Sequence, residues 1–201
     1  AELPAIAQTP APPPMSPADA RLDAMLTRWF EENVDLSPEY ATNLGLDRDA
    51  RAALSGQLRQ AGIADADADR ARARARWTEI QTVSEDGLSD QAKVSLAVYR
   101  FTAEGAARAA DIPDGGGISP YVVTQRSGAY FSVPDFMANQ HRLETEADAE
   151  AFISRLSAFA RLLDQESERI TADAALGVML PGFLMDKTLT QLRTLRDTPA
   201  Y

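Results

Sequence analysis

Apolar residues recur at helical spacing along most of the chain. The clearest example follows Thr145, a typical N-cap, with Asp148 three residues later completing a capping box. Large apolar residues then fall at intervals of three, four or seven, which mark one face of a helix. They are Phe152, Leu156, Phe159, Leu163 and Ile170, widened by Ala149, Ile153 and Ala160. The pattern predicts a long helix that buries this stripe and leaves Arg155 and Arg161 on its polar remainder.

Two shorter helices are predicted near the N-terminus. Each begins with Ser-Pro, an N-cap followed by proline at the first helical position, at Ser16-Pro17 and at Ser37-Pro38. Gly45 is placed to end the second helix. The first helix has one apolar face, made of Leu22, Met25, Leu26, Trp29, Phe30 and Val34. The adjacent aromatic residues on it suit a ligand stack, but their helical spacing favours the core. Residues 47–58 predict one or two helical turns.

The segment from Asp65 alternates alanine with charged residues. Alternation is typical of a strand, but alanine is a strong helix former and gives a sheet little to pack, so a helix is predicted. Asp65 and Asp67 lie near its start and a run of arginines follows, an order that suits the helix dipole. The arginines could form a nucleic-acid patch. The neighbouring acids favour instead a solvated face with pairs such as Asp69 with Arg72.

The remaining pattern predicts two more helices around a long loop. Ser89 caps a helix that reaches Ala110, with a predicted buried edge of Val94, Ala97, Val98, Phe101 and Gly105. A Gly- and Pro-rich loop spans about residues 111–134, with room for a short strand at 121–124. A last helix covers residues 181–196. The fold class is therefore mainly α, a multi-helix, bundle-like array with one long loop.

Composition and charge narrow the function classes. The 201 residues carry a net charge of −10, and such a field repels the phosphates of nucleic acids and anionic membranes. No apolar run approaches the ~20 residues that span a bilayer, and the absence of cysteine excludes thiolate metal sites. Residues 1–15 form an Ala- and Pro-rich tail that we expect to be flexible, followed by a helical domain over residues 16–201. The tail is typical of what remains after signal-peptide cleavage, or of a cut in a longer protein.

Candidate chemistry is confined to one stretch. His141 is the only histidine, so neither a zinc site nor a Cys-His nucleophile can be assembled from this chain. We expect His141 to be a structural hydrogen-bonding residue and Asp135 to be an N-cap. The loop that contains them is the candidate wall of a substrate cleft, because it combines a glycine, whose lack of a side chain permits close backbone approach, with aromatic and polar residues. Its candidate residues are Gly128, Tyr130, Phe131, Asp135, Asn139 and His141. Alternatively, its aromatic residues only anchor the loop on the core.

Three segments in order resemble a known family. They read WFEENVDLSPEYATNLGLD, SGAYFSVPDFMANQHRLETEADAEAFISRL and VMLPGFLMDKTLTQL, and the resemblance spans about residues 20–197. The sequence resembles the N-terminal part of bacterial proteins grouped as domain of unknown function 885. These are predicted zincin-like metallopeptidases, often exported or lipid-anchored. The resemblance implies a later His-Glu zinc motif that this chain lacks, so it transfers no catalytic residue and no metal ligand, and zinc is expected only in the full-length protein.

Two functions are consistent with the sequence. In one, the chain is the N-terminal helical segment of an exported, periplasmic or secreted zinc-metallopeptidase-like protein that acts on peptides. In the other, it is a self-contained helical binding module without enzymatic activity. The expected partners are the C-terminal part of the same protein or a second copy, because an apolar edge of the last helix would be left bare. That edge contains Leu184, Leu189, Leu192 and Leu195.

Overall fold

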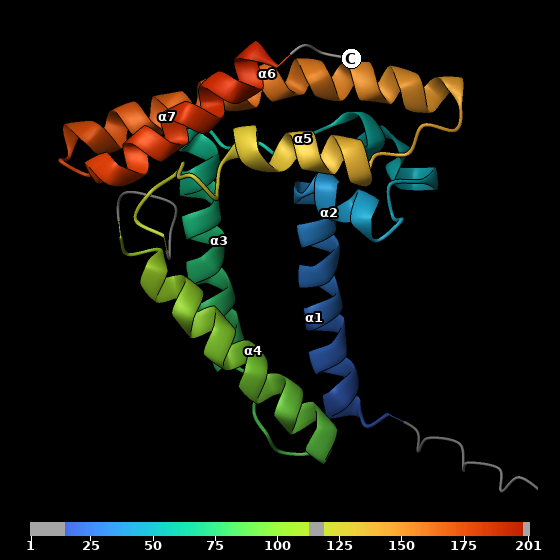
Figure 1. Ribbon diagram of the computed structural model, residues 1–201. Coiled ribbons are helices and arrows are strands. Elements are labelled where there is room, and N and C mark those ends of the chain that lie inside the picture. Colours follow the sequence, from blue (N-terminus) through green and yellow to red (C-terminus); the bar gives the residue numbers. More distant parts are fainter. Residues whose placement is uncertain (1–14, 113–118, 199–201) are drawn as a thin grey trace, which may run out of the picture.

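The computed structural model describes residues 15–112 and 119–198, and within them the predicted mainly α fold is confirmed (Figure 1). The predicted flexible tail lies outside the described residues except for Met15. The helices are α1 (Pro17–Leu36), α2 (Pro38–Asn43), the 3₁₀ helix η1 (Asp49–Gly56), α3 (Ile63–Gln81), α4 (Asp90–Ala109), α5 (Ala129–Asn139), α6 (Glu146–Ala175) and α7 (Gly182–Asp197).

The helices form an upper layer on two supports (Figure 1). Helices α5, α6 and α7 lie across the top of the molecule, and α6 is the longest of them. Helix α1 descends on one side, and the antiparallel pair α3 and α4 descends on the other. Each region has its own core, because an amphipathic helix is stable only when its apolar face is covered. The upper core joins α5 and α6 to Leu58 and Ala61, and the lower core joins α1, α3 and α4.

Most of the predicted helix boundaries are confirmed. The Ser16 hydroxyl accepts a hydrogen bond from the Asp19 amide at 3.0 Å, and Ser89 and Thr145 cap α4 and α6 in the same way. Gly45 follows α2 with a φ of +68°, a conformation that favours glycine. The alanine-rich segment is the helix α3. Local capping signals therefore placed the ends of these helices correctly.

The predicted buried edge of α4 is wrong. Val94, Val98 and Phe101 are exposed, Phe101 by 79%. The buried face lies elsewhere on the helix and consists of Leu96, Ala103 and Ala107. Small side chains let the backbones of α3 and α4 approach closely, so this face is selected by size and not by hydrophobicity alone. The large apolar residues are left facing outward.

The predicted stripe of α6 is correct only in part. Phe152, Phe159 and Leu163 pack against the upper core, but Leu156, Ile153 and Ile170 are exposed. The fully buried positions are Arg155, Ala158, Leu162 and Glu166. Arg155 was expected on the polar side, and the pattern gave no expectation for Glu166. They are buried because each satisfies backbone groups of another segment, as described below.

The loop predicted at about residues 111–134 ends earlier in the structure. Helix α5 begins at Ala129 and contains Pro134, so the Gly- and Pro-rich segment ends at Gly128. Asp135 lies inside α5 and is not an N-cap. The predicted strand at 121–124 is also wrong, since this segment has a single isolated bridge between Thr124 and Ser127. Burial of the apolar face of α5 outweighs the cost of an internal proline.

Candidate functional site

Helix α5 is held at its N-terminus by a buried carboxylate. Both oxygens of Glu166, from α6, accept hydrogen bonds from the Ala129 amide, at 3.0 and 2.8 Å, and Arg59 donates to the same carboxylate at 3.2 Å. An anion at this position is favoured by the positive end of the helix dipole. Burial nevertheless raises the pKa of Glu166 above its ordinary value. This interaction fixes the start of the predicted cleft segment.

Gly128 has a structural role that accounts for its identity. Its φ is +105°, and a Cβ built on it would lie 2.9 Å from Val123 Cγ2 and 3.4 Å from Glu166 Oε2. Both restrictions exclude larger residues. The close backbone approach predicted at this glycine is therefore made by the chain itself, through Val123.

Tyr130 belongs to the core. It is 5% exposed, and its hydroxyl lies 2.8 Å from the Thr124 carbonyl oxygen and 2.7 Å from Gln191 Oε1. Burial raises the pKa of this phenol. Tyr130 therefore joins α5 to α7 and to the preceding segment. This aromatic residue packs the segment onto the helices, as the alternative reading of the sequence predicted.

Three of the six candidate residues share the exposed face of α5. Phe131, Asp135 and Asn139 are four residues apart, and all are exposed, Phe131 by 49%. The Asn139 amide donates to Asp135 Oδ1 at 2.8 Å. Gly128 and His141 lie beyond opposite ends of this helix, ~20 Å apart at 1.5 Å per residue. The six residues thus follow one helix and do not converge on one point.

His141 makes a hydrogen bond through each ring nitrogen. Its Nδ1 accepts a hydrogen bond from Arg155 Nη1 at 2.7 Å, and its Nε2 donates to the Asp148 carbonyl at 3.0 Å. Arg155 is completely buried, and its guanidinium also donates to three other acceptors in η1, α2 and the residue after η1. These acceptors are Gln57 O at 2.9 Å, Leu54 O at 3.1 Å and Thr42 Oγ1 at 2.6 Å.

A polar hollow of about 460 Å³ opens beside this network. It is lined by Asp47, Arg48 and Arg142 as well as by His141 and Arg155. Thr42 donates to Asp47 at 2.8 Å, which connects the buried arginine to a carboxylate through one hydroxyl. Burial lowers the pKa of Arg155. Both carboxylates and guanidinium groups line the hollow, so its lining does not select one sign of ligand charge.

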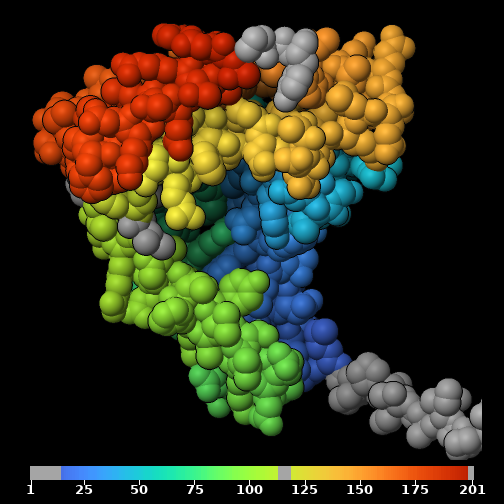
Figure 2. All heavy atoms as spheres, viewed as in Figure 1, coloured from blue at the N-terminus to red at the C-terminus, as the bar shows by residue number. Residues whose placement is uncertain are grey.

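A second hollow, of about 480 Å³, lies between α1, α3 and α4. Figure 2 shows the molecule hollowed between α4 (green) and α1 (blue). Aromatic side chains of Trp29, Phe30, Tyr40 and Tyr99 contribute to its wall. Arg76 lies over the ring of Trp29, with 5.3 Å between its Cζ and the ring centroid. The hollow thus combines apolar rings with guanidinium groups.

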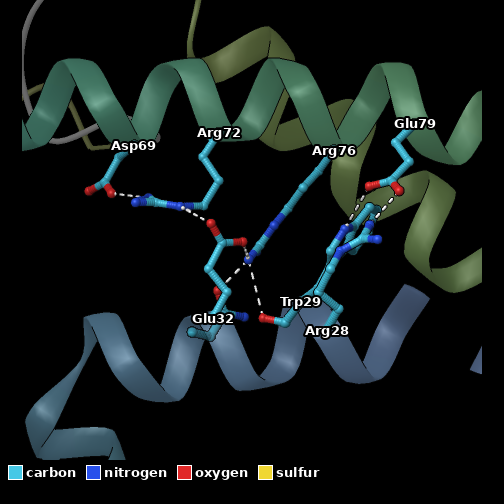
Figure 3. A network of polar contacts seen from close by, with 8 residues as sticks. Arg28, Trp29, Glu32, Asp69, Arg72, Arg76 and Glu79 are labelled. Atoms are coloured by element: carbon cyan, nitrogen blue, oxygen red, sulfur yellow. Dashed lines mark hydrogen bonds and ion pairs between the residues drawn. The ribbon is translucent and has the colours of Figure 1, made fainter. Parts of the chain in front are cut away.

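Two of the four arginines of α3, Arg72 and Arg76, turn away from solvent, which corrects the predicted solvated face for this pair. Figure 3 shows them directed at α1: Glu32 accepts from Arg76 at 2.6 Å and from Arg72 at 3.2 Å. Only about a fifth of the Arg72 and Arg76 side chains is exposed. Arg72 also pairs with Asp69 as predicted. Acids of both helices compensate these cations, so the network joins α1 to α3 and is not an anion site.

A third hollow is apolar and lies beneath α7. It has a volume of about 270 Å³. Its walls come from the segment at 120–123, the end of α6 and one side of α7, with Val123, Ala174 and Leu192 among them. Thr188 is buried there, but its hydroxyl donates to Leu184 O at 2.9 Å. We call this hollow the α7 pocket. Most of its lining is apolar, and Asp173 is the charged residue in its wall.

The described residues do not provide a metal centre. Within residues 15–112 and 119–198, no three His, Cys, Asp or Glu side chains are grouped so that they could hold an ion. The side chains in these ranges therefore do not form the set of ligands that zinc needs, and we derive no metal-dependent step from them. In the same ranges, no helix has the length and hydropathy needed to cross a bilayer.

The comparisons with known proteins agree with the predicted resemblance. A solved structure described as "the crystal structure of the putative lipoprotein from Colwellia psychrerythraea" is similar to this chain, with a TM-score of 0.78 and 21% sequence identity. The match covers 88% of this chain but only 31% of that chain, and it shows a shared fold. A comparison with curated proteins finds no match. The family model described as "Bacterial protein of unknown function (DUF885)" matches residues 38–201, and the chain therefore belongs to this family.

Proposed function

We propose that this chain is the N-terminal helical segment of an exported bacterial zinc-metallopeptidase-like protein. It supplies scaffold and one wall of a peptide cleft, while zinc ligands and hydrolytic groups come from other sequence. Membership in the family and the threefold greater length of the similar chain support a role as part of a larger protein. The description of that similar protein as a lipoprotein supports export.

The observation that carries the cleft assignment is the division of α5 into two faces. One face is anchored: Val133, Phe136 and Met137 are buried, and Glu166 holds the N-terminus. The other face presents an apolar ring, a carboxylate and an amide from Phe131, Asp135 and Asn139. A rigid helix that presents such groups can bind the side chain and backbone of a peptide, because binding groups need support from packed elements.

Substitution on the exposed face tests this assignment. In the natural gene product with peptidase activity, Phe131→Ala and Asp135→Asn are expected to lower kcat/KM at least tenfold, about 1.4 kcal/mol. The melting temperature should not change, since both side chains are exposed. Leu156→Ala is a matched control, because Leu156 is 48% exposed on α6. Unchanged kcat/KM in both α5 variants would assign α5 to the scaffold alone.

The second candidate is a self-contained helical binding module. The aromatic hollow between α1 and α4 favours it, because rings and guanidinium groups can hold a partner without catalysis. The two functions differ in one observable property. A module binds peptide and releases it intact, whereas the peptidase releases shorter products, which mass spectrometry separates directly.

A further inference from the structure

The turn between α6 and α7 is uncharged. Residues 174–185 read AALGVMLPGFLM and contain no ionisable side chain, in a chain with a net charge of −10. We call this segment the apolar hairpin. Three of its large side chains are strongly exposed: Leu176 by 66%, Met179 by 61% and Phe183 by 67%. Isolated exposed apolar residues are ordinary, but a contiguous group marks an interaction surface.

The apolar hairpin borders the α7 pocket. Met179 and Met185 belong to both, and Leu189 of α7 continues the wall while remaining 39% exposed. Projecting side chains and an apolar hollow are therefore neighbours on one surface. In a two-fold dimer both copies contribute the same surface. A side chain that projects from one copy can therefore enter the hollow of the other copy, and the equivalent contact forms in the reverse direction.

We propose that the apolar hairpin docks on a second copy of this chain, with Phe183 of each copy directed into the α7 pocket of the other. This inference goes beyond the proposed function and does not depend on hydrolysis. It also gives a specific surface to the self-association expected from the apolar residues of α7.

The available area suits a small dimer interface. Including Ile170 and Leu195, six large apolar side chains of this region are between 37% and 67% exposed. With ~200 Å² on each such side chain, they present roughly 600 Å² of apolar surface, against about 800 Å² per partner in a standard interface. Contacts at the polar rim would supply the remainder.

Charge favours a second copy over a bilayer. Two chains of net charge −10 repel each other at most surfaces. The apolar hairpin contains no charged side chain, so contact between two hairpins places no like charges of these segments against each other. A segment that enters an anionic membrane usually carries lysine or arginine beside its apolar residues. This hairpin is flanked directly by Asp173 and Asp186, and Lys187 follows on one side, so its borders carry a net charge of −1 and disfavour an anionic phospholipid surface.

The test is a sedimentation series over a range of protein concentrations. The parent chain is expected to dimerise, and Phe183→Asp and Leu189→Arg are each expected to weaken dimerisation at least tenfold. An equal mixture of these two variants should dimerise again, because the new carboxylate of one faces the new guanidinium of the other across the interface. Phe101→Asp is the matched control, because Phe101 is 79% exposed on α4, and this variant should dimerise like the parent.

Circular dichroism of each variant establishes that it is folded. A parent chain that stays monomeric at the highest concentration overturns the proposal. So does dissociation by Phe101→Asp without dissociation by Phe183→Asp, or a mixture that fails to recover. Flotation with phosphatidylcholine vesicles, with and without phosphatidylglycerol, covers the membrane alternative, and parent binding that Phe183→Asp abolishes would assign the hairpin to lipid.

Discussion

Arg155 provides the most informative test of how the upper layer is held together. Arg155→Met keeps most of the side-chain volume and its packing on Phe136, whose ring centroid lies 4.8 Å from the guanidinium carbon. It removes the donors that serve Leu54 O, Gln57 O and His141 Nδ1, as well as the one to the Thr42 hydroxyl, which can rotate to another partner. The substitution therefore separates the hydrogen-bonding role of this residue from its packing role.

The expected loss follows from the acceptors that remain. An acceptor left buried without a donor costs ~1–3 kcal/mol, so three of them cost several kcal/mol. Against this, the replacement by methionine removes a buried cation together with the cost of its desolvation. Such replacements can leave the free energy of unfolding unchanged. Here the two backbone carbonyls cannot be replaced by apolar groups, so the first effect wins. We expect the free energy of unfolding to fall by about 3 kcal/mol, and Tm by about 6–12 °C.

Urea and thermal unfolding followed by circular dichroism measure this loss. Arg161→Met is the matched control, because Arg161 is exposed on the same helix, and its effect should stay within about 0.5 kcal/mol. Arg155→Lys should also destabilise, since one ammonium cannot reach acceptors on both sides of the guanidinium. If Arg155→Met unfolds within about 1 kcal/mol of the parent, the network does not hold the layer together and the reasoning is refuted.

Three further predictions follow from single groups. Gly128→Ala should lower the free energy of unfolding by about 2 kcal/mol or more, because of the positive φ at this position and the contact with Val123. Gly105→Ala, in open space on α4, should raise it by about 0.5–1 kcal/mol. Chemical denaturation compares the two variants. Burial raises the pKa of Glu166 above its ordinary 4.5, so ionising this group costs stability as the pH rises. The parent should therefore lose unfolding free energy relative to Glu166→Gln as the pH rises above about 4.5, and a pH-independent difference would contradict this. The hydrogen bond from Arg76 and the nearby guanidinium groups lower the pKa of Glu32, whose contribution is therefore present above pH 4.5 and lost as the pH falls; Glu32→Gln should cost about 1 kcal/mol near neutral pH, more than Glu104→Gln, which breaks one similarly exposed pair.

The sequence predicted helix ends better than helix faces. Ser16, Ser89 and Thr145 each cap a helix through a local hydrogen bond, and local signals are readable within a few residues. The buried face of α4 depended on how closely α3 approaches it. The distance of this approach is a tertiary property, which the sequence pattern does not report. A ranking by hydrophobicity therefore favoured Phe101 over Ala103 as the buried residue, whereas the structure buries Ala103 and exposes Phe101.

The burial of Arg155 and Glu166 depends on contacts with distant parts of the chain. Arg155 satisfies carbonyls about a hundred residues away in sequence, and Glu166 satisfies the amide of Ala129. One signal was available: both residues lie at helical spacing with Ala158 and Leu162, on a face that a purely apolar stripe leaves incomplete. A charged residue in register with apolar neighbours is a candidate for such a backbone contact.

We propose that this chain supplies scaffold and cleft wall to a zinc-dependent peptidase and does not hold the zinc itself. The most direct test measures zinc content and peptide hydrolysis side by side, for the natural gene product and for residues 1–201. We expect about one zinc per chain and chelator-sensitive cleavage in the natural gene product, and neither property in residues 1–201. Stoichiometric zinc or cleavage in residues 1–201, or a natural gene product that carries zinc and cleaves no peptide, would contradict it.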